Sequence, residues 1–471
     1  MMLNLKYKSP YRSWYLRYEN DLDAFIPELW ANESLAILVE NMIASSLVYR
    51  DFENTLQNYG DVVNVRRPSE FTAKRKAQAD SVIIQDAIAT NIQVPLNQHI
   101  HTSFLIRDGE ESKAFKDLVD EFLRPAIVAQ ARIMDQIVLG QYIQFIDNNA
   151  GGVGTLTATN AKANLLNLRQ VLNTNKAPVT DRQLILNPIT ETTLLGLDLF
   201  LAANQVGDTG QALQEASLGR KLGFNMYMDQ NMPSVLAGVN TTASGAISNA
   251  SGYPVGTKTF TVSGFTGAVT TGGYIRIAGD DTPLRITAHT ETLGATTSIT
   301  TATGIKTAVV QAAVITYYLG GTVNNSGGYL AGYAKELTVA GFSVAPQVGQ
   351  AVTIGTAATG PVYTVIAVNG LVGITLDRPL DVAVNNSDIV TLGTSGNFNL
   401  AFHKNAIALV VRPLARPKPG TGALSAVVNW NDLSMRTVIT YDGNKQGHLV
   451  TCDMLAGIAV LDKRLGAVLL A

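Results

Sequence analysis

The feature that most constrains this chain is an abrupt change of composition near its middle. From Asn240 to Ser395 the sequence is dominated by Gly, Thr, Ser, Val and Ala, has many turn signals and shows almost no helical period. The segments on both sides combine apolar residues at helical spacing with apolar strands. We therefore predict an α+β fold in which a β-rich insertion interrupts a mixed domain.

The insertion contains an internal repeat. Lys258-Thr-Phe-Thr-Val-Ser-Gly-Phe265 matches Lys335-Glu-Leu-Thr-Val-Ala-Gly-Phe342 at an offset of 335 − 258 = 77 residues. The alternating Ile275 and Ile277 recur at the same offset as Val352 and Ile354. Two tandem copies of one small β-domain are expected.

The two ends of the insertion should lie close together. The helix-rich part stops at Pro233, and mixed character returns at Asn397. The strand expected from Phe402 must rejoin the domain that the chain left, so the insertion should enter and leave through one stalk. We expect both β-domains to project from the core and to fold independently of it.

The segment before the long helix changes from an irregular pattern to a helical period and then to strand-like runs. Residues 1–31 are aromatic and polar without a clean period and are interpreted as an extended arm. A helix is expected within 32–59, with Asn32 or Ser34 as its N-cap. Three strand-like runs follow and flank a charged stretch: Val62–Val65, Val82–Ile84 and Ile100–Ile106. They predict a long two-stranded loop over 60–108.

A long helix comes next, within 109–159. Pro125 can start a helix but cannot continue one, so the helix should run from there to about Asp147. Its length would be roughly 35 Å at 1.5 Å per residue, enough for the spine of a domain. One face carries the apolar residues Ile127, Ala131, Met134, Val138, Tyr142 and Phe145.

The remaining segments mix helices with buried strands. Between about 160 and 238, helices are expected at 164–172 and 191–203 around an apolar strand at 183–187. After the insertion, residues 397–471 should supply strands at 406–411, 438–441 and 449–460.

Composition excludes several classes of protein. The chain has 35 Lys and Arg against 37 Asp and Glu, a net charge of -2, so any contact with nucleic acid must be local. Only 15% of its 471 residues are charged, below the roughly 25% of typical soluble proteins, which suggests large surfaces buried against partners. Cys452 is the only cysteine, which excludes intrachain disulfides and multi-cysteine metal sites. Residues 1–17 lack the apolar core of a signal peptide, and no run of 18 apolar residues predicts a membrane span.

Few residues suggest chemistry. His99 and His101 would share one face of a strand and could begin a metal site, but a solvated strand face is favoured because no Cys or carboxylate nearby completes the ligands. Asp280 and Asp281 could bind a hard cation, although an Asp-rich turn is favoured. Cys452, with His448 four residues away, lacks an orienting third group, and no Gly-x-Ser-x-Gly motif is present. We therefore expect no catalytic site, no metal and no cofactor.

The densest basic cluster lies in the predicted two-stranded loop and consists of Arg66, Arg67, Lys74, Arg75 and Lys76. Such a run is often only a solvated face. Ion pairing with a neighbouring subunit is the equal alternative, because Glu70, Asp80 and Asp86 lie among the bases and a projecting loop can reach another chain. Direct DNA binding is the weakest of the three.

The order of these parts resembles the major capsid proteins of tailed double-stranded-DNA bacteriophages, whose fold is shared with encapsulins. Leu218-Gly-Arg-Lys-Leu-Gly-Phe-Asn-Met-Tyr-Met-Asp-Gln-Asn-Met-Pro233 is similar to the family's Gly-rich segment ahead of a strand. Phe402-His-Lys-Asn-Ala-Ile-Ala-Leu-Val-Val-Arg-Pro-Leu414 is similar to its late strand. The insertion lies where the short-tailed-phage branch has an extra β-barrel domain, which residues 335–393 resemble.

This resemblance implies a division of the chain into family domains. They are an N-terminal arm (1–31), an N-terminal helix (32–59), an extended loop (60–108), a spine helix with the peripheral domain (109–159), an axial domain (160–238), two inserted β-domains (240–320 and 330–395) and the axial and peripheral return (397–471).

The resemblance also implies a non-enzymatic subunit that self-assembles through pentamers and hexamers into an icosahedral shell around the phage genome. Expected partners are scaffolding and portal proteins, a decoration protein, and double-stranded DNA touched non-specifically at the inner face. The expected locations are the virion capsid and, during assembly, the host cytoplasm. A surface adhesin or decoration protein with β-sandwich domains is the alternative, and a hydrolase is a weaker one.

Overall fold

A computed structural model describes most of the chain. The described residues are 25–51, 60–67, 71, 73–76, 78, 81–82, 84–85, 90–107, 119–154, 156–197, 200, 218–235, 244–265, 267, 269–318, 320–355, 361–418, 422–430 and 432–471. The expected arm therefore lies outside them up to residue 24.

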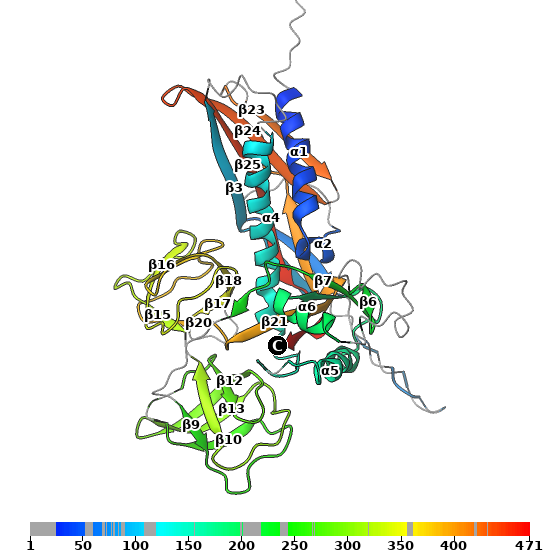
Figure 1. The fold of residues 1–471 in the computed structure, drawn as a ribbon, viewed down its shortest axis with the longest axis vertical. Helices are drawn as coiled ribbons and strands as arrows, with labels where there is room; N and C mark the ends of the chain where they lie inside the picture. The colour runs from blue at the N-terminus through cyan, green and yellow to red at the C-terminus, as the bar shows by residue number, and fades with distance from the viewer. Residues whose placement is uncertain are drawn as a thin grey trace, which may run out of the picture.

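Two long helices cover an antiparallel sheet in the upper part of the molecule (Figure 1). Helix α1 (Phe25–Asn41) packs against the spine helix α4 (Arg124–Leu139), which a π turn (Val119–Leu123) precedes and the 3-10 helix η2 (Gly140–Phe145) extends. All six apolar residues predicted on one face of the spine are buried. The sheet contains β3 (Gln98–Arg107), β22 (Ile407–Arg412), β23 (Leu424–Trp430), β24 (Leu433–Asp442) and the long β25 (Gly447–Val460).

The boundary between arm and first helix was predicted wrongly. Helix α1 already begins at Phe25, because Pro27 lies in the first turn, where its missing N–H costs no hydrogen bond. Trp30 is buried beside Phe104, with 6.0 Å between ring centroids. Ser34 is not a cap, since its hydroxyl donates to the Trp30 carbonyl at 2.6 Å. The helix ends at Asn41 rather than near 59, and the short α2 (Ala44–Leu47) follows.

The extent of the two-stranded loop was also predicted wrongly. Strand β1 (Val62–Arg67) pairs with β2 (Thr90–Pro95), whereas Val82 and Ile84 lie outside any strand. Strand β3, assigned to the loop by its sequence, runs antiparallel to β25 for its whole length and belongs to the body. Because β25 is 14 residues long, β24 and β22 pair one after the other along one of its edges, and β3 pairs with residues 447–456 along the opposite edge.

A second sheet forms the middle of the molecule. Its order is β4-β26-β21-β5-β7-β6, with β8 paired to β21, and α5 (Ala161–Thr174) and α6 (Pro188–Leu195) accompany it. Asn187 caps α6 by accepting a hydrogen bond from the Ile189 N–H at 3.0 Å. The strands are β4 (Asn149–Ala150), β5 (Arg182–Leu186), β6 (Arg220–Lys221), β7 (Phe224–Met228), β8 (Ser234–Val235), β21 (Gly396–His403) and β26 (Gly466–Leu470).

The insertion forms two closed six-stranded barrels, which we call barrel 1 and barrel 2. Barrel 1 contains β9 (Gly245–Ile247), β10 (Thr259–Ser263), β11 (Tyr274–Ile277), β12 (Leu284–Thr292), β13 (Ala295–Thr301) and β14 (Val314–Tyr318). Barrel 2 contains β15 (Gly321–Val323), β16 (Glu336–Ala340), β17 (Ala351–Ile354), β18 (Val362–Asn369), β19 (Gly373–Leu376) and β20 (Ile389–Thr391).

The two barrels repeat one topology. Strands β10 and β16, and likewise β11 and β17, stand 77 residues apart and occupy equivalent places in the two strand orders. Barrel 2 begins with β15 at Gly321, so the expected start of the second copy at 330 was wrong: it would remove a strand from the closed barrel. The ends of the insertion meet where Ser234 pairs with Asn397.

The expected independence from the core was wrong for barrel 2. Its buried residues form one continuous hydrophobic core with α1, α4 and the upper sheet, and β18 packs directly on α4 and η2. Gly140 permits this approach, because a Cβ there would lie 2.5 Å from the Thr364 hydroxyl. Barrel 1 has its own core, and of its described residues Tyr274 and Tyr318 join the common one.

Candidate interaction surface

The base of the β1/β2 hairpin is fixed to the body. Val94 and Leu96 are buried with Ala408, Val410 and Leu455 in a small apolar core of their own. The Gly60 N–H donates to the Leu96 carbonyl at 2.9 Å, and the Leu96 N–H donates to the Asp61 carbonyl at 2.8 Å. The hairpin therefore leaves the body from an ordered, apolar footing.

The described residues between β1 and β2 are exposed, except for the half-buried Gln85. Lys74, Arg75 and Lys76 are solvent-exposed, as expected of a surface cluster. Arg66 and Arg67 end β1, opposite Asn91 and Thr90, but their side chains lie outside the description. So do Glu70, Asp80 and Asp86. Pairing of the five basic residues with another subunit stays a prediction.

Large apolar residues accompany the basic ones, and sequence reasoning missed them as surface residues. Phe71, Val82 and Ile84 are 62%, 73% and 84% exposed. The sequence signal was available, because these residues flank a charged stretch rather than an apolar run. Val82 and Ile84 were instead interpreted as part of a strand. Together with Lys74–Lys76 they give the loop a mixed apolar and cationic surface.

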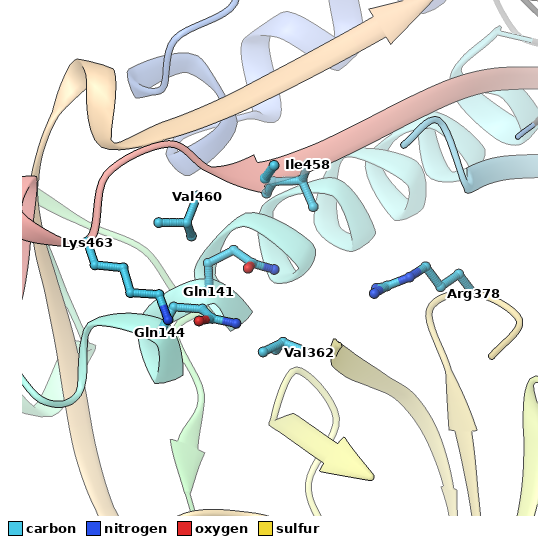
Figure 2. Close-up of a pocket in the computed structure, with 8 residues that line it drawn as sticks. Gln141, Gln144, Val362, Arg378, Ile458, Val460 and Lys463 are labelled. Atoms are coloured by element: carbon cyan, nitrogen blue, oxygen red, sulfur yellow. The ribbon is translucent and has the colours of Figure 1, made fainter. Parts of the chain in front are cut away.

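A small pocket lies between the body and barrel 2 (Figure 2). Gln141 and Gln144 from η2, Ile458 and Val460 from β25, and Val362 from β18 border it, together with Ala459, Arg378 and Lys463. Its volume is about 230 Å³. The lining has no Asp, Glu, His or Cys, and its titratable amine is Lys463, whose pKa is lowered from its usual value by partial burial.

His99 is a structural residue of the upper sheet. Its Nε2 lies 3.3 Å from Asp453 Oδ2, and Arg436 Nε donates to Asp453 Oδ1 at 2.9 Å. Burial would raise the pKa of Asp453, but hydrogen bonds from His99 and Arg436 outweigh it and hold the pKa below its usual value. The ring of His101 stands 6.0 Å from that of His99. The arrangement joins β3, β24 and β25.

The aspartates of barrel 1 organise a turn. Asp280 accepts hydrogen bonds from the N–H groups of Lys306 at 2.8 Å and Thr307 at 2.6 Å. Asp281 pairs with Arg276 at 2.9 Å. Within the described ranges, no group of three or more His, Cys, Asp or Glu residues is placed to hold a metal ion.

Cys452 lies in the core between β24 and α1. Its sulfur is 3.7 Å from the Thr437 hydroxyl and 3.8 Å from that of Ser34. Burial raises the pKa of this thiol to about 11, so it is protonated at neutral pH and is a poor nucleophile. None of the helices in the described part of the chain is long and apolar enough to cross a membrane.

Comparison with known proteins gives likenesses among solved structures only. No family model matches the chain, and no curated protein matches it. A structure of Mycobacterium phage Che8 is 11% identical, with 91% of this chain and 90% of that chain covered and a TM-score of 0.41. The capsid structure of the cyanophage P-SCSP1u is 10% identical, with 91% and 88% covered and a TM-score of 0.43. The capsid of Ralstonia phage GP4 is 8% identical, with 91% and 87% covered and a TM-score of 0.40.

Proposed function

We propose that this chain is the major capsid protein of a tailed double-stranded-DNA bacteriophage and that it works by assembling with copies of itself into an icosahedral shell. The observation that supports the proposal is that the β1/β2 hairpin has an anchored base and an exposed, partly apolar loop. Its base packs against β22 and β25 in a small apolar core of its own, while its loop presents Phe71, Val82, Ile84 and three cations to solvent. Exposed apolar side chains gathered on one loop mark an interaction surface. The family resemblance of 218–233 and 402–414 supports the same conclusion.

The mechanism is association rather than turnover. Rings around five- and six-fold axes need head-to-tail contacts, in which a projecting element of one copy meets a different surface of the next. Each contact can be weak, because a subunit held by several neighbours at once gains from their combined effect. Weak contacts also allow misplaced subunits to leave during growth. The low charged fraction of 15% suits a chain with much of its surface buried in such contacts.

The proposed partners follow from this role. Copies of the chain would form pentamers and hexamers with scaffolding and portal proteins during assembly in the host cytoplasm, and decoration proteins could bind the finished virion. Packaged DNA would be touched locally and non-specifically, in keeping with the net charge of -2. The subunit would need no catalytic residue, metal or cofactor.

A surface adhesin or decoration protein is the second candidate, favoured only by the two barrels. Such a chain has no use for a spine helix and an anchored hairpin. Electron microscopy of the purified full chain, alone and with scaffolding protein, separates the two. Closed shells or capsomer rings are expected. A chain that stays monomeric under every condition would contradict the proposal that it forms shells.

The basic cluster gives a sharper experiment. Reversal of Arg66, Arg67, Lys74, Arg75 and Lys76 to Glu should abolish shell formation and leave the monomer folded, because exposed charges contribute little to stability. Lys258→Glu, on the exposed surface of barrel 1, is the control and should assemble normally. Normal shells from the fivefold variant, checked by microscopy beside an unchanged circular dichroism spectrum, would refute the proposed ion pairing.

A further inference from the structure

Barrel 2 contacts the point where the hairpin joins the body. Strand β2 ends at Pro95 and β3 begins at Gln98, so the connecting turn is Leu96-Asn97. Asn97 Nδ2 donates to Asp381 Oδ1 at 2.9 Å, and Gln98 Nε2 donates to Asp377 Oδ2. Two side-chain amides at the foot of the hairpin are thus held by two carboxylates of barrel 2.

These carboxylates are themselves held rigidly. The Arg378 guanidinium pairs with Asp377 at 3.0 Å and with Asp381 at 2.8 Å, and it lies 4.5 Å over the Tyr363 ring. Asp377 Oδ1 also accepts from the Thr364 N–H at 2.7 Å, and the Tyr363 hydroxyl accepts from the Asp381 N–H at 2.8 Å. Asp377 is fully buried, and a guanidinium stacked on a ring and paired at both edges has little freedom to turn.

The cluster is not a requirement of the barrel itself. Thr364 of barrel 2 and Arg285 of barrel 1 are equivalent, because they pair with the first residues of β17 and β11. The Asp377 N–H donates to the Thr364 carbonyl, and the Ala302 N–H donates to the Arg285 carbonyl. Ala302 and Thr303 therefore stand where barrel 2 has Asp377 and Arg378. Barrel 1 closes without the charges, so their place in barrel 2 calls for a role outside barrel closure.

We propose that Asp377, Arg378 and Asp381 form a brace through which barrel 2 sets the direction in which the hairpin leaves the body. The three are positioning residues, and the inference rests on the proposed function of the hairpin. The footing of Val94 and Leu96 is apolar and non-directional, whereas the two amide–carboxylate bonds fix an angle. A six-residue strand is about 20 Å long, so a tilt of about 10° at its foot moves its far end by about 3–4 Å. That displacement is enough to misplace a contact on a neighbouring subunit.

The brace can be cut without breaking barrel 2. Asn97→Ala combined with Gln98→Leu removes both amides, keeps the volume of the buried Gln98 side chain, and leaves Arg378 paired with both acids. In the unassembled full chain, amide hydrogen exchange over 60–67 and 90–96 should accelerate at least about tenfold, while exchange in β16–β19 stays unchanged. Unchanged exchange at the hairpin would overturn the brace.

A reversed pair tests whether the contact itself matters. Asn97→Asp alone places its carboxylate beside that of Asp381 and should accelerate amide hydrogen exchange in the hairpin. Adding Asp381→Asn should restore slow exchange, because the amide at 381 then donates to the carboxylate at 97. Failure of the second change to restore it, with the chain folded by circular dichroism, would also overturn the brace. Asp147→Asn, at the barrel 1 contact, is the matched control and should leave hairpin exchange unchanged.

Assembly gives an independent result. The Asn97→Ala/Gln98→Leu variant should form shells with a wider spread of diameters than the unmodified chain. If the unmodified chain forms no shells, the proposed function fails, yet the exchange result still decides the brace. If shells form and the variant gives the same diameters and the same exchange, the brace fails and the shell function stands.

Discussion

Barrel 1 and barrel 2 share a strand order and differ in how they join the rest of the molecule. Barrel 2 merges its apolar core with the spine and braces the hairpin through a buried arginine. Barrel 1 keeps a separate core and touches the body mainly through polar groups around residues 147–153. The comparison teaches that the repeated apolar pattern specifies barrel closure, whereas residues on the outer surface decide docking and are free to differ between copies.

The barrel 1 contact combines Tyr274 and Tyr318, which join the common core, with several polar interactions. Arg285 pairs with Asp147 at 2.8 Å, the Lys306 amine donates to the backbone and side chain of Asn149, and the Val153 N–H donates to the Asp281 carbonyl at 3.0 Å. Partly exposed ion pairs of this kind contribute about 0–1 kcal/mol each. Burial of an apolar face, as for barrel 2, contributes about 25 cal/mol per Å² of surface removed from water. The two barrels should therefore respond differently to the same damage.

Deleting each barrel in turn should give the largest difference. Replacement of 244–318 by a short Gly-Ser linker should leave a folded body, because barrel 1 has its own core. Replacement of 321–391 should yield aggregated protein, because the apolar faces of α4 and η2 lose their cover. Size-exclusion chromatography and circular dichroism of the two variants test this, and a soluble, helical barrel 2 deletion would contradict the shared core.

Substitution of a single core residue by Ala in each barrel should show how far destabilisation spreads from that barrel. Phe260→Ala in barrel 1 should cost about 3–5 kcal/mol, and Leu376→Ala in barrel 2 about 2–5 kcal/mol, through lost burial and the cavity left behind. The loss should stay within barrel 1 for Phe260→Ala and should reach α4 for Leu376→Ala. Residue-resolved hydrogen exchange distinguishes the two patterns. Equal spread into α4 from both variants would show that the cores are coupled.

Solution pH should act on the body that holds barrel 2 more than on barrel 1. Asp135 on the spine is buried, its carboxylate accepting from the Ile43 and Ser45 N–H groups at 2.8 Å each. Burial and then the nearby charge of Asp229 raise the pKa of Asp135 to about 6. A raised pKa in the folded state means that stability is full at low pH and is lost as pH rises through about 6. The body should therefore unfold more easily at pH 7.5 than at pH 5.

Asp229→Asn is the matched variant for this effect. Asp229 Oδ1 accepts a hydrogen bond from the Asn231 N–H at 2.8 Å, which the amide oxygen of Asn can also accept, so the substitution removes the charge and keeps this bond. The substitution should stabilise the body by about 1–2 kcal/mol at pH 7.5 and should flatten the pH dependence. Thermal unfolding at several pH values measures both. A variant as pH-dependent as the unmodified chain would show that burial, without the charge of Asp229, raises the pKa of Asp135.

Breaking the polar contact of barrel 1 should give the smallest effect. Asp147→Asn removes the ion pair with Arg285 and should lower stability by less than about 1 kcal/mol. Arg378→Met in barrel 2 is the contrast and should cost about 3–5 kcal/mol, because the buried carboxylate of Asp377 would lose its cationic partner. Chemical denaturation of both variants is sufficient, and similar costs would contradict the difference in docking.

Local pattern was enough to predict much of the fold. The helical spacing of apolar residues from Ile127 to Phe145 places the spine, because a helix has one period whatever it packs against. The 77-residue repeat likewise places equivalent strands, since closing a small barrel requires apolar residues at alternating positions. Where pattern was weak, prediction failed. Pro27 and Trp30 look irregular in sequence, yet they belong to α1 because Trp30 finds a buried site beside Phe104.

The candidate interaction surface was predicted only in part. Charge alone identified Lys74–Lys76, because a run of cations is visible without knowledge of the fold. The exposure of Phe71, Val82 and Ile84 was missed, since an apolar residue in sequence is by default assigned to a core, and the charged stretch that they flank was not used as a signal. The brace was equally hidden: Asn97 and Asp381 are 284 residues apart, and nothing in either neighbourhood predicts their contact.

The sequence by itself determined the α+β class, the spine and the repeated β-domains, because these depend on periodicity and composition within short windows. Only the tertiary structure decided that β3 leaves the loop for the body, that barrel 2 shares the central core, and that barrel 1 keeps a core of its own and adds only Tyr274 and Tyr318, of its described residues, to the central one. The physical reason is that docking depends on which surfaces meet across long stretches of chain. Two copies with the same internal pattern can then present Asp377 and Arg378 in one case and Ala302 and Thr303 in the other.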